Sequence, residues 1–160
     1  MTEVQGDKRA PYSIGWRDQF RVGIPQVDSE HKRLFALVKS LSVTSADQTV
    51  AELLDYVVMH FSNEQALMER SCYPDFAQHL KLHEEFGAHV ADFLGSGEAW
   101  HEDRVQELRR FLNRWLIGHI LTHDLRFGHW YASAVARPVV PPSAPVPPER
   151  AKGLWARLFG

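Results

Sequence analysis

Cysteine is nearly absent from this sequence, because Cys72 is the only one among 160 residues. A single thiol excludes an intramolecular disulfide and fits a reducing compartment, and a chain of this length can bury a core without cross-links. Long apolar runs are lacking as well, which excludes a membrane-spanning helix of about 18 residues or more. The polar start of the chain is unlike a signal peptide. We therefore expect a soluble, cytoplasmic protein of one domain.

An excess of charge of either sign is also lacking, since the formal net charge is −2 and the sequence pI is near 6.5. Without a basic field, nucleic acid is not an expected partner. The sequence contains no Gly-rich phosphate-binding loop and no cysteine-rich zinc motif. The function must therefore rest on other residues, and the chain contains nine histidines.

Apolar residues recur at helical spacing in four blocks between Asp28 and Tyr131, separated by short segments that contain Ser, Asp, Gly or Pro. Nothing in this region alternates with the period of a strand. Short connections suit antiparallel neighbours, so the sequence predicts an all-α, up-down-up-down four-helix bundle. The predicted helices cover 28–43, 46–70, 74–94 and 102–132.

Two segments flank the predicted bundle on its N-terminal side. Residues 1–14 are expected to be flexible. Residues 15–27 should form an ordered arm that packs on the bundle, because Trp16, Phe20 and Ile24 can supply apolar contacts. The domain is accordingly predicted to cover residues 15–136.

A proline-rich linker follows the predicted domain at 137–149, where clustered prolines exclude a helix and favour an extended spacer. The last segment, 150–160, is too short to fold alone. In a helix its large apolar residues would share one face, which is typical of a docking peptide. We predict a protein partner for this tail, with a membrane surface as the weaker alternative. The residues of that face are Leu154, Trp155, Leu158 and Phe159.

Histidines and a glutamate interrupt the apolar stripes at helical spacing. His60 and Glu64 are four residues apart on the second predicted helix, and His79 and His83 are four apart on the third. A lone buried histidine usually has an ordinary hydrogen bond, but two such pairs in one core indicate a common partner. A metal ion is the simplest such partner.

The predicted hairpin between the second and third helices aligns these two pairs. Ser71 and Cys72 lie midway between Glu64 and His79, and also midway between His60 and His83. At ~1.5 Å per residue, the two ligand levels lie roughly 11 and 17 Å into the bundle. The start of the first helix and the end of the fourth lie at this same end in an up-down bundle. Those ends carry His31 and His119.

The seventh ligand is not settled by helical spacing alone. From His119, a residue four positions on is rotated by only ~40°, whereas a residue five positions on is rotated by ~140°. This favours His123 over Asp124. However, Ile117 and Ile120 lie near the direction of Asp124, so a wide buried arc could include it. Both residues remain candidates on this evidence.

The order of the candidate ligands resembles the hemerythrin signature. The flanking segments agree, since they read GIPQVDSEHKRLF, HFSNEQALM, YPDFAQHLKLH and WLIGHILTHD. The resemblance covers roughly residues 15–132. Within the family, the sequence is similar to the bacterial single-domain branch. The resemblance also implies that Asp124 is the seventh ligand. The signature residues are His31, His60, Glu64, His79, His83, His119 and Asp124.

The resemblance implies a pair of non-haem irons bridged by Glu64, Asp124 and an oxo or hydroxo oxygen. One iron would take His79, His83 and His119. The other would take His31 and His60 and keep one open position for dioxygen. Two departures from the family pattern exist. Gln65 replaces an often acidic residue, and Cys72 replaces the usual glycine before Tyr-Pro.

The expected function is reversible binding of dioxygen, for carriage, storage, delivery or sensing, rather than catalysis. Five neutral histidines against two carboxylates place less anionic charge around iron than in ferritin-like enzymes. A di-iron enzyme that acts as an oxidase, a peroxidase or a nitric-oxide-handling protein is the alternative. A bundle merely fixed by zinc is a third. We expect a dioxygen pocket lined by Phe61, Trp115, Leu116 and Ile120, although each could equally be ordinary core.

Overall fold

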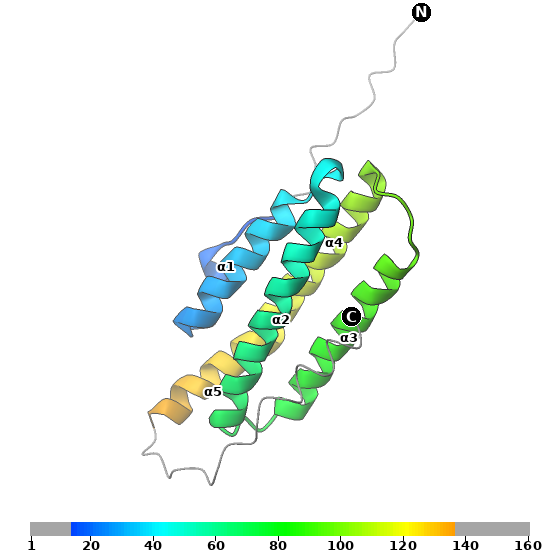
Figure 1. Ribbon diagram of the computed structural model, residues 1–160. Helices are drawn as coiled ribbons and strands as arrows, with labels where there is room; N and C mark the ends of the chain where they lie inside the picture. The colour runs from blue at the N-terminus through cyan, green and yellow to red at the C-terminus, as the bar shows by residue number, and fades with distance from the viewer. Residues whose placement is uncertain (1–13, 137–160) are drawn as a thin grey trace, which may run out of the picture.

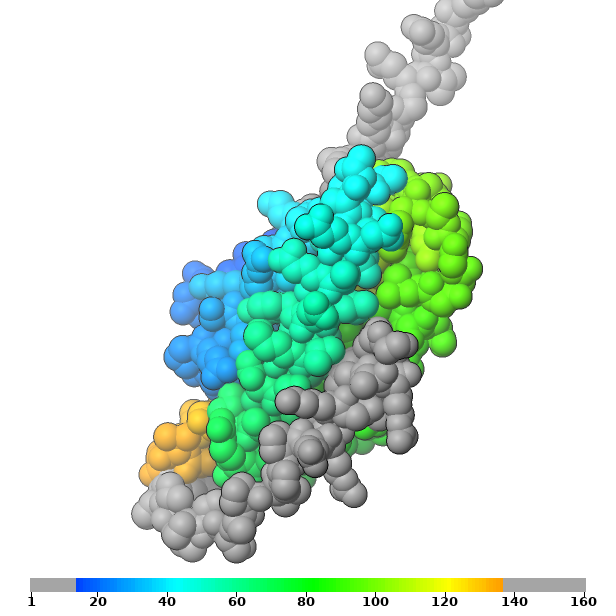
Figure 2. All heavy atoms as spheres, in the orientation of Figure 1, coloured from blue at the N-terminus to red at the C-terminus, as the bar shows by residue number. Residues whose placement is uncertain are grey.

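A computed structural model describes residues 14–136, and its ordered elements are helical (Figure 1). The all-α, four-helix-bundle prediction is confirmed. The helix α1 packs against α2 and α4, and α2 packs against α3. In the space-filling view, α1 and α2 lie side by side along one face (Figure 2). The helices are α1 (Pro25–Ser40), α2 (Ala46–Arg70), α3 (Phe76–Gly95), α4 (Glu102–His119) and α5 (Leu125–Val135).

The first helix lies earlier in the chain than predicted, because it covers Pro25–Ser40 rather than 28–43. Proline is well suited to the first turn of a helix, where its missing N–H is not needed for an internal hydrogen bond. The helix ends where Leu41 takes a non-helical conformation with ψ 129. A short 3-10 turn, Val43–Ser45, then leads into α2.

The turn between α2 and α3 lies where the sequence places it and has a Schellman geometry. The Tyr73 N–H donates to the Met68 carbonyl at 2.9 Å, and the Cys72 N–H donates to the Glu69 carbonyl at 3.1 Å. Cys72 has a φ of 56°, in the left-handed region that glycine adopts most easily. The buried Met68 and Tyr73 side chains supply the apolar component of this motif.

The fourth helix is not the uninterrupted α-helix predicted over 102–132. A π-helical segment, Ile120–Asp124, separates α4 from α5. The Leu125 N–H donates to the Ile120 carbonyl, five residues earlier, so this turn contains one more residue than an α-helical turn. Residues on either side keep helical backbone angles, and the chain therefore runs through α4 and α5 as one bundle member.

The predicted arm is present and reaches the core. Phe20, Val22 and Ile24 are buried. The Phe20 ring stacks on Phe35 of α1 with ring centroids 5.3 Å apart, and Trp16 meets both rings edge-on. These contacts hold the arm beside the bundle.

The arm is also fixed to the first and the last helix by contacts of its backbone. Asp28 of α1 accepts hydrogen bonds from the Val22 N–H at 2.7 Å and the Gly23 N–H at 3.3 Å. On α5, Gly128 lies so close to the arm that a Cβ there would be 2.0 Å from the Val22 carbonyl oxygen. The absence of a side chain at Gly128 therefore permits this packing.

Three predicted segments lie wholly or almost wholly outside the described residues. They are 1–14, of which only Ile14 is described, the linker 137–149 and the tail 150–160. Within residues 14–136, no helix combines the length and apolar character needed to cross a membrane.

Candidate metal centre

Seven side chains that the sequence places on four bundle members converge at one buried site. They form two groups, one of five residues and one of four. Within each group the ligand atoms all lie within 4.8 Å of one another. Both groups contain Glu64 and Asp124. All seven residues are buried, toward the end of the bundle where α2 turns into α3. The group of five is Glu64, His79, His83, His119 and Asp124, and the group of four is His31, His60, Glu64 and Asp124.

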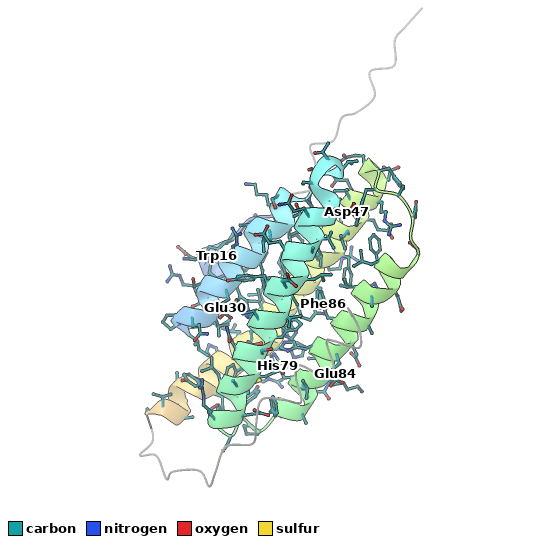
Figure 3. The ribbon with its side chains drawn as sticks, viewed as in Figure 1. Trp16, Glu30, Asp47, His79, Glu84 and Phe86 are labelled. Atoms are coloured by element: carbon teal, nitrogen blue, oxygen red, sulfur yellow. The ribbon has the colours of Figure 1, made fainter. Side chains whose placement is uncertain are left out.

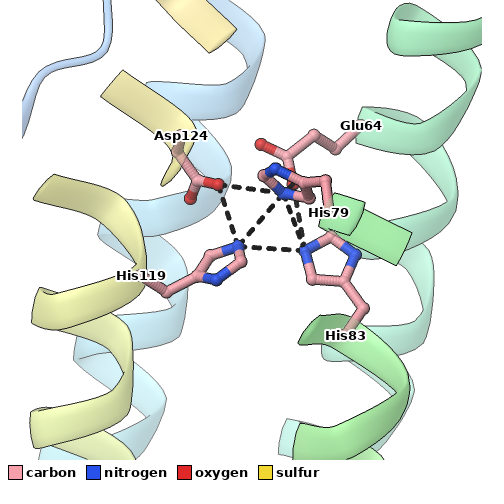
Figure 4. Close-up of side chains that lie close together, drawn as sticks. All are labelled: Glu64, His79, His83, His119 and Asp124. Atoms are coloured by element: carbon pink, nitrogen blue, oxygen red, sulfur yellow. Dashed lines mark hydrogen bonds and ion pairs between the residues drawn. The ribbon is translucent and has the colours of Figure 1, made fainter. Parts of the chain in front are cut away.

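Three histidine nitrogens in the group of five form an equilateral triangle (Figure 4). The Nε2 atoms of His79, His83 and His119 are each 3.1 Å from the other two. A triangle with these edges is one face of an octahedron whose central ion lies ~2.2 Å from each nitrogen. A tetrahedral ion would need ~1.9 Å, shorter than zinc–nitrogen bonds usually are. The triangle therefore fits an octahedral ion such as iron.

Hydrogen bonding alone does not account for this triangle. Each neutral imidazole has one donor nitrogen and one acceptor nitrogen, so three Nε2 atoms cannot all satisfy one another around a closed ring. Three ring nitrogens that converge on one centre are instead the arrangement that a cation requires.

The two carboxylates are placed to serve both groups. Oε2 of Glu64 lies 3.2 Å from Nε2 of His79 and 3.3 Å from Nε2 of His83. Its other oxygen, Oε1, has no hydrogen-bond partner among the described residues, although the side chain is completely buried. Asp124 is similar, because Oδ1 faces His119 at 2.9 Å while Oδ2 faces His31 at 3.1 Å. Asp124 thus presents one oxygen to each group, and Glu64 keeps Oε1 free of hydrogen bonds from the described residues beside the His79 and His83 contacts of Oε2.

The group of four contributes the second set of donors. His31 from α1 and His60 from α2 are packed edge to face, with ring centroids 4.7 Å apart. His60 directs Nδ1 away from the site toward Glu30, which leaves Nε2 to face it. Buried carboxylates without full hydrogen bonding and converging imidazoles fit a pair of cations.

The histidines of the triangle differ in their protonation. Burial lowers the pKa of His83 to about 3, so its imidazole is neutral and ready to bind a metal at neutral pH. Burial also opposes the charged form of His79. Hydrogen bonds to Asp124 and Glu64 outweigh that effect and raise the pKa of His79 to about 9. Without metal, His79 therefore holds a proton between the two carboxylates.

Both bridging carboxylates are ionised. Burial and the nearby Asp124 would raise the pKa of Glu64, but hydrogen bonds from His79 and His83 hold it well below its ordinary value. Burial likewise opposes ionisation of Asp124, and the charge and hydrogen bond of His119 overcome this so that its pKa is also depressed. Two anionic oxygens in a dry interior favour a cation strongly.

The π-helical segment explains why Asp124 rather than His123 joins the cluster. In a turn closed by hydrogen bonds five residues apart, residues five positions apart share a face. Asp124 consequently lies below His119 and is only 1% exposed. His123 is partly exposed, and its ring centroid is 5.4 Å from that of His119. An α-helical wheel cannot reveal such a turn.

One buried side chain that the sequence analysis did not connect to the histidines, Glu30, holds His60 from the side away from the cluster. Glu30 lies between α1 and α2 (Figure 3), and its Oε2 is 2.7 Å from Nδ1 of His60. Asn63 and Gln26 donate hydrogen bonds to the other oxygen of Glu30. No periodicity in the sequence marks such contacts, because they depend on how two helices approach each other.

The predicted pocket residues are all at least partly buried. Phe61 stacks on His83 with ring centroids 3.6 Å apart and also contacts His60 at 5.6 Å. Trp115 stacks on His119 at 4.3 Å. Leu116 and Ile120 are buried in the core. The two aromatic rings therefore cover the histidines with apolar surface.

The remaining histidines lie apart from the cluster. His89 is exposed and stacks on Phe111 of α4. His101 is exposed at the start of α4, and its Nε2 lies 2.7 Å from Glu98. His129 is exposed on α5.

Comparisons with known proteins agree with the helical fold and with a cation-binding site. The family model described as the Hemerythrin HHE cation binding domain matches residues 22–130. Bacteriohemerythrin of Stenotrophomonas maltophilia is 34% identical over 116 residues, which cover 68% of this chain and 75% of that protein. A hemerythrin-like protein of Naegleria gruberi is 33% identical over 118 residues, covering 73% and 92%. A crystal structure of wild-type hemerythrin superposes with a TM-score of 0.64 at 28% identity, covering 72% of this chain and 95% of that one.

Proposed function

This chain belongs to the hemerythrin family, and on that premise we propose that its seven clustered side chains hold two non-haem iron ions that bind dioxygen reversibly. The observation that carries the proposal is the sharing of Glu64 and Asp124 between two adjoining donor groups. Two ferrous ions together can supply the electrons that reversible dioxygen binding requires. The family consists of oxygen-binding proteins, so this chain is a binding protein and not an enzyme.

The two donor groups are unequal, which gives the proposed dioxygen site its place. One group offers five protein donors and the other offers four. If both ions shared a solvent oxygen, the first group would complete octahedral coordination and the second would lack one ligand. We propose that dioxygen binds at the second group, beside His31 and His60.

The apolar side chains that pack against the histidines favour reversible binding of dioxygen. We propose that the pocket consists of Phe61, Trp115, Leu116 and Ile120. Phe61 supports this assignment, because its ring contacts one histidine of each group. Apolar walls exclude water and offer no acid that could protonate bound oxygen. Replacing Phe61 by Leu should accelerate the loss of the ferrous state in air, as followed by visible absorption.

Metal analysis tests the proposed centre directly. The purified protein should contain about two irons per chain, because each donor group can hold one ion. Purified protein with a single zinc ion and no iron would contradict the proposal. The 3.1 Å nitrogen triangle supports an octahedral ion over a tetrahedral zinc ion.

We infer that the domain responsible for this activity covers residues 15–136 and serves oxygen transport or local storage in the cytoplasm. The cytoplasmic assignment is supported by the single, exposed and unpaired Cys72, which suits a reducing compartment. Cell fractionation with an antibody checks it. Recovery of the protein outside the cytoplasm would contradict it.

We further propose that the tail, residues 150–160, docks on a protein partner. The linker of residues 137–149 would act as a spacer of roughly 40 Å at ~3.1 Å per residue. Deletion of 150–160 should leave iron content and oxygen binding unchanged and alter what co-purifies with the protein. Unchanged co-purification, or loss of the iron site on truncation, would contradict this role. Release from membranes would instead identify a lipid surface.

A further inference from the structure

Two histidines of the cluster have a polar partner at Nδ1, the ring nitrogen that faces away from the site. The two partner side chains differ in charge. Nδ1 of His60 lies 2.7 Å from the carboxylate of Glu30, and Nδ1 of His83 lies 3.4 Å from the amide nitrogen Nε2 of Gln65. Glu30 and Gln65 are each 5% exposed, so burial does not distinguish them. The two supports therefore differ in charge: one is anionic and the other is neutral.

The chemistry of metal binding fixes what each support must do. Nε2 of His83 points into the nitrogen triangle, so its Nδ1 carries the hydrogen when a metal is bound. Gln65 then has to turn its amide by about 180° from its orientation in this structure, so that the oxygen, the acceptor of that group, faces Nδ1. Glu30 accepts the corresponding hydrogen from His60. Both residues thus act on the metal through a histidine.

The charge of an acceptor behind an imidazole changes how strongly the ring donates to its metal. A carboxylate draws the Nδ1 hydrogen toward itself, which makes Nε2 more electron-rich and favours the ferric ion. An amide does so much less. The group of four, with Glu30 behind His60, therefore receives more electron density than the group of five receives from Gln65.

We propose that Gln65 is a positioning residue that gives the two irons different reduction potentials, with the ion of the group of five the harder to oxidise. The inference rests on the proposed di-iron function. A neutral acceptor at His83 helps to keep that ion ferrous, the state needed to bind dioxygen, while Glu30 favours electron release where dioxygen is expected. Exchanging the charges should move the potentials in opposite directions.

Midpoint potentials of the iron-loaded, full-length protein test this directly. Gln65→Glu adds a carboxylate and should lower the reduction potential of the ion in the group of five. The expected shift is ~59 mV for one electron, which is about a tenfold change in the ferric-to-ferrous ratio. Glu30→Gln removes a carboxylate and should raise the reduction potential of the ion in the group of four by a similar amount. Gln48→Glu is the matched control, because Gln48 is exposed near the far end of α2 and the variant has the same net charge as Gln65→Glu. It should leave the potential unchanged.

A second measurement separates orientation from charge. Gln65→Met has similar volume but only a weak sulfur acceptor, so the His83 Nδ1 hydrogen would lose most of its partner's interaction. Iron should then leave to a chelator about tenfold faster than from the unaltered protein, whereas Gln65→Glu should retain it.

Three outcomes would be decisive. Iron-loaded Gln65→Glu and Glu30→Gln with unchanged potentials would overturn the proposal, as would a shift of both in the same direction. Failure of the unaltered protein to bind two irons would instead overturn the proposed function on which it rests.

Discussion

His123 and Asp124 are neighbours in the sequence but have different places in the structure, since only Asp124 joins both donor groups. Asp124→Ala should reduce bound iron from about two ions to fewer than one per chain, because it removes an oxygen from each group. His123→Ala is the matched control and should retain nearly all the iron. Metal analysis of the two variants checks this. The reverse result would show that helical periodicity was the better guide.

The proton held by His79 makes metal binding depend on pH. The pKa of this group is raised to about 9 in the metal-free protein, so at lower pH a metal must displace the proton. Affinity for ferrous iron should rise by at least about tenfold per pH unit up to that value, because the His79 proton is released in addition to any proton that the shared solvent oxygen loses. Anaerobic calorimetry in buffers of different ionisation enthalpy measures both. Binding without proton release near pH 7 would contradict the assigned protonation.

Cys72 is a strained residue at the turn between α2 and α3. With a Cβ atom, a φ of 56° costs about 1 kcal/mol relative to glycine, although glycine gains some unfolded-state entropy. Cys72→Gly should therefore raise the free energy of unfolding by roughly 0.5 kcal/mol in denaturant titrations. Cys72→Ala keeps the Cβ and should not. Equal stabilisation by both variants would attribute the effect to the thiol instead.

Individual ligands could be predicted better than the residues behind them. His60, Glu64, His79 and His83 follow from spacing within each helix and from the symmetry of one hairpin. Glu30 could not be predicted in the same way, because its contact with His60 depends on the distance between α1 and α2. Gln65 was recognisable only as a departure from the family pattern.

At the scale of elements, the agreement was closest where caps and turns are strong. The predicted second helix, 46–70, matches α2, which ends in a Schellman turn. The fourth helix was misjudged because the π-helical segment Ile120–Asp124 contains no glycine or proline that would mark an interruption. This segment places Asp124 in the cluster, and such a tertiary requirement is not visible in local helix propensity.

The contact between the arm and α5 depends on one glycine. In Gly128→Ala the new Cβ would lie 2.0 Å from the Val22 carbonyl oxygen, so the arm would have to move away. We expect a loss of about 2 kcal/mol in the free energy of unfolding.

Gly118→Ala provides the matched control for that variant. Gly118 is exposed on α4, and nothing lies within 4 Å of the position its Cβ would take. Alanine favours helix there, so this variant should be stabilised by about 0.5 to 1 kcal/mol. Thermal unfolding of both proteins measures the difference. A Gly128→Ala variant as stable as Gly118→Ala would show that the arm does not need this close approach.

At the scale of the whole molecule, the bundle and the metal centre depend on each other. The up-down topology brings the start of α1, the end of α4 and the hairpin of α2 and α3 to one end (Figure 1). That topology was predictable because four apolar stripes with short connections leave few alternatives. The arm was predictable from its aromatic residues, whereas its approach to Gly128 was not.

Oxygen titration of the reduced, iron-loaded protein tests the central claim most directly. Dioxygen added in small steps to an initially anaerobic solution should produce a visible absorption band. The band should saturate at about one dioxygen per two irons, because one donor group leaves a position open. The band should disappear when dioxygen is removed and return when it is added again. Continuous consumption of dioxygen, or an iron-loaded protein that gives no band, would contradict reversible binding at this centre.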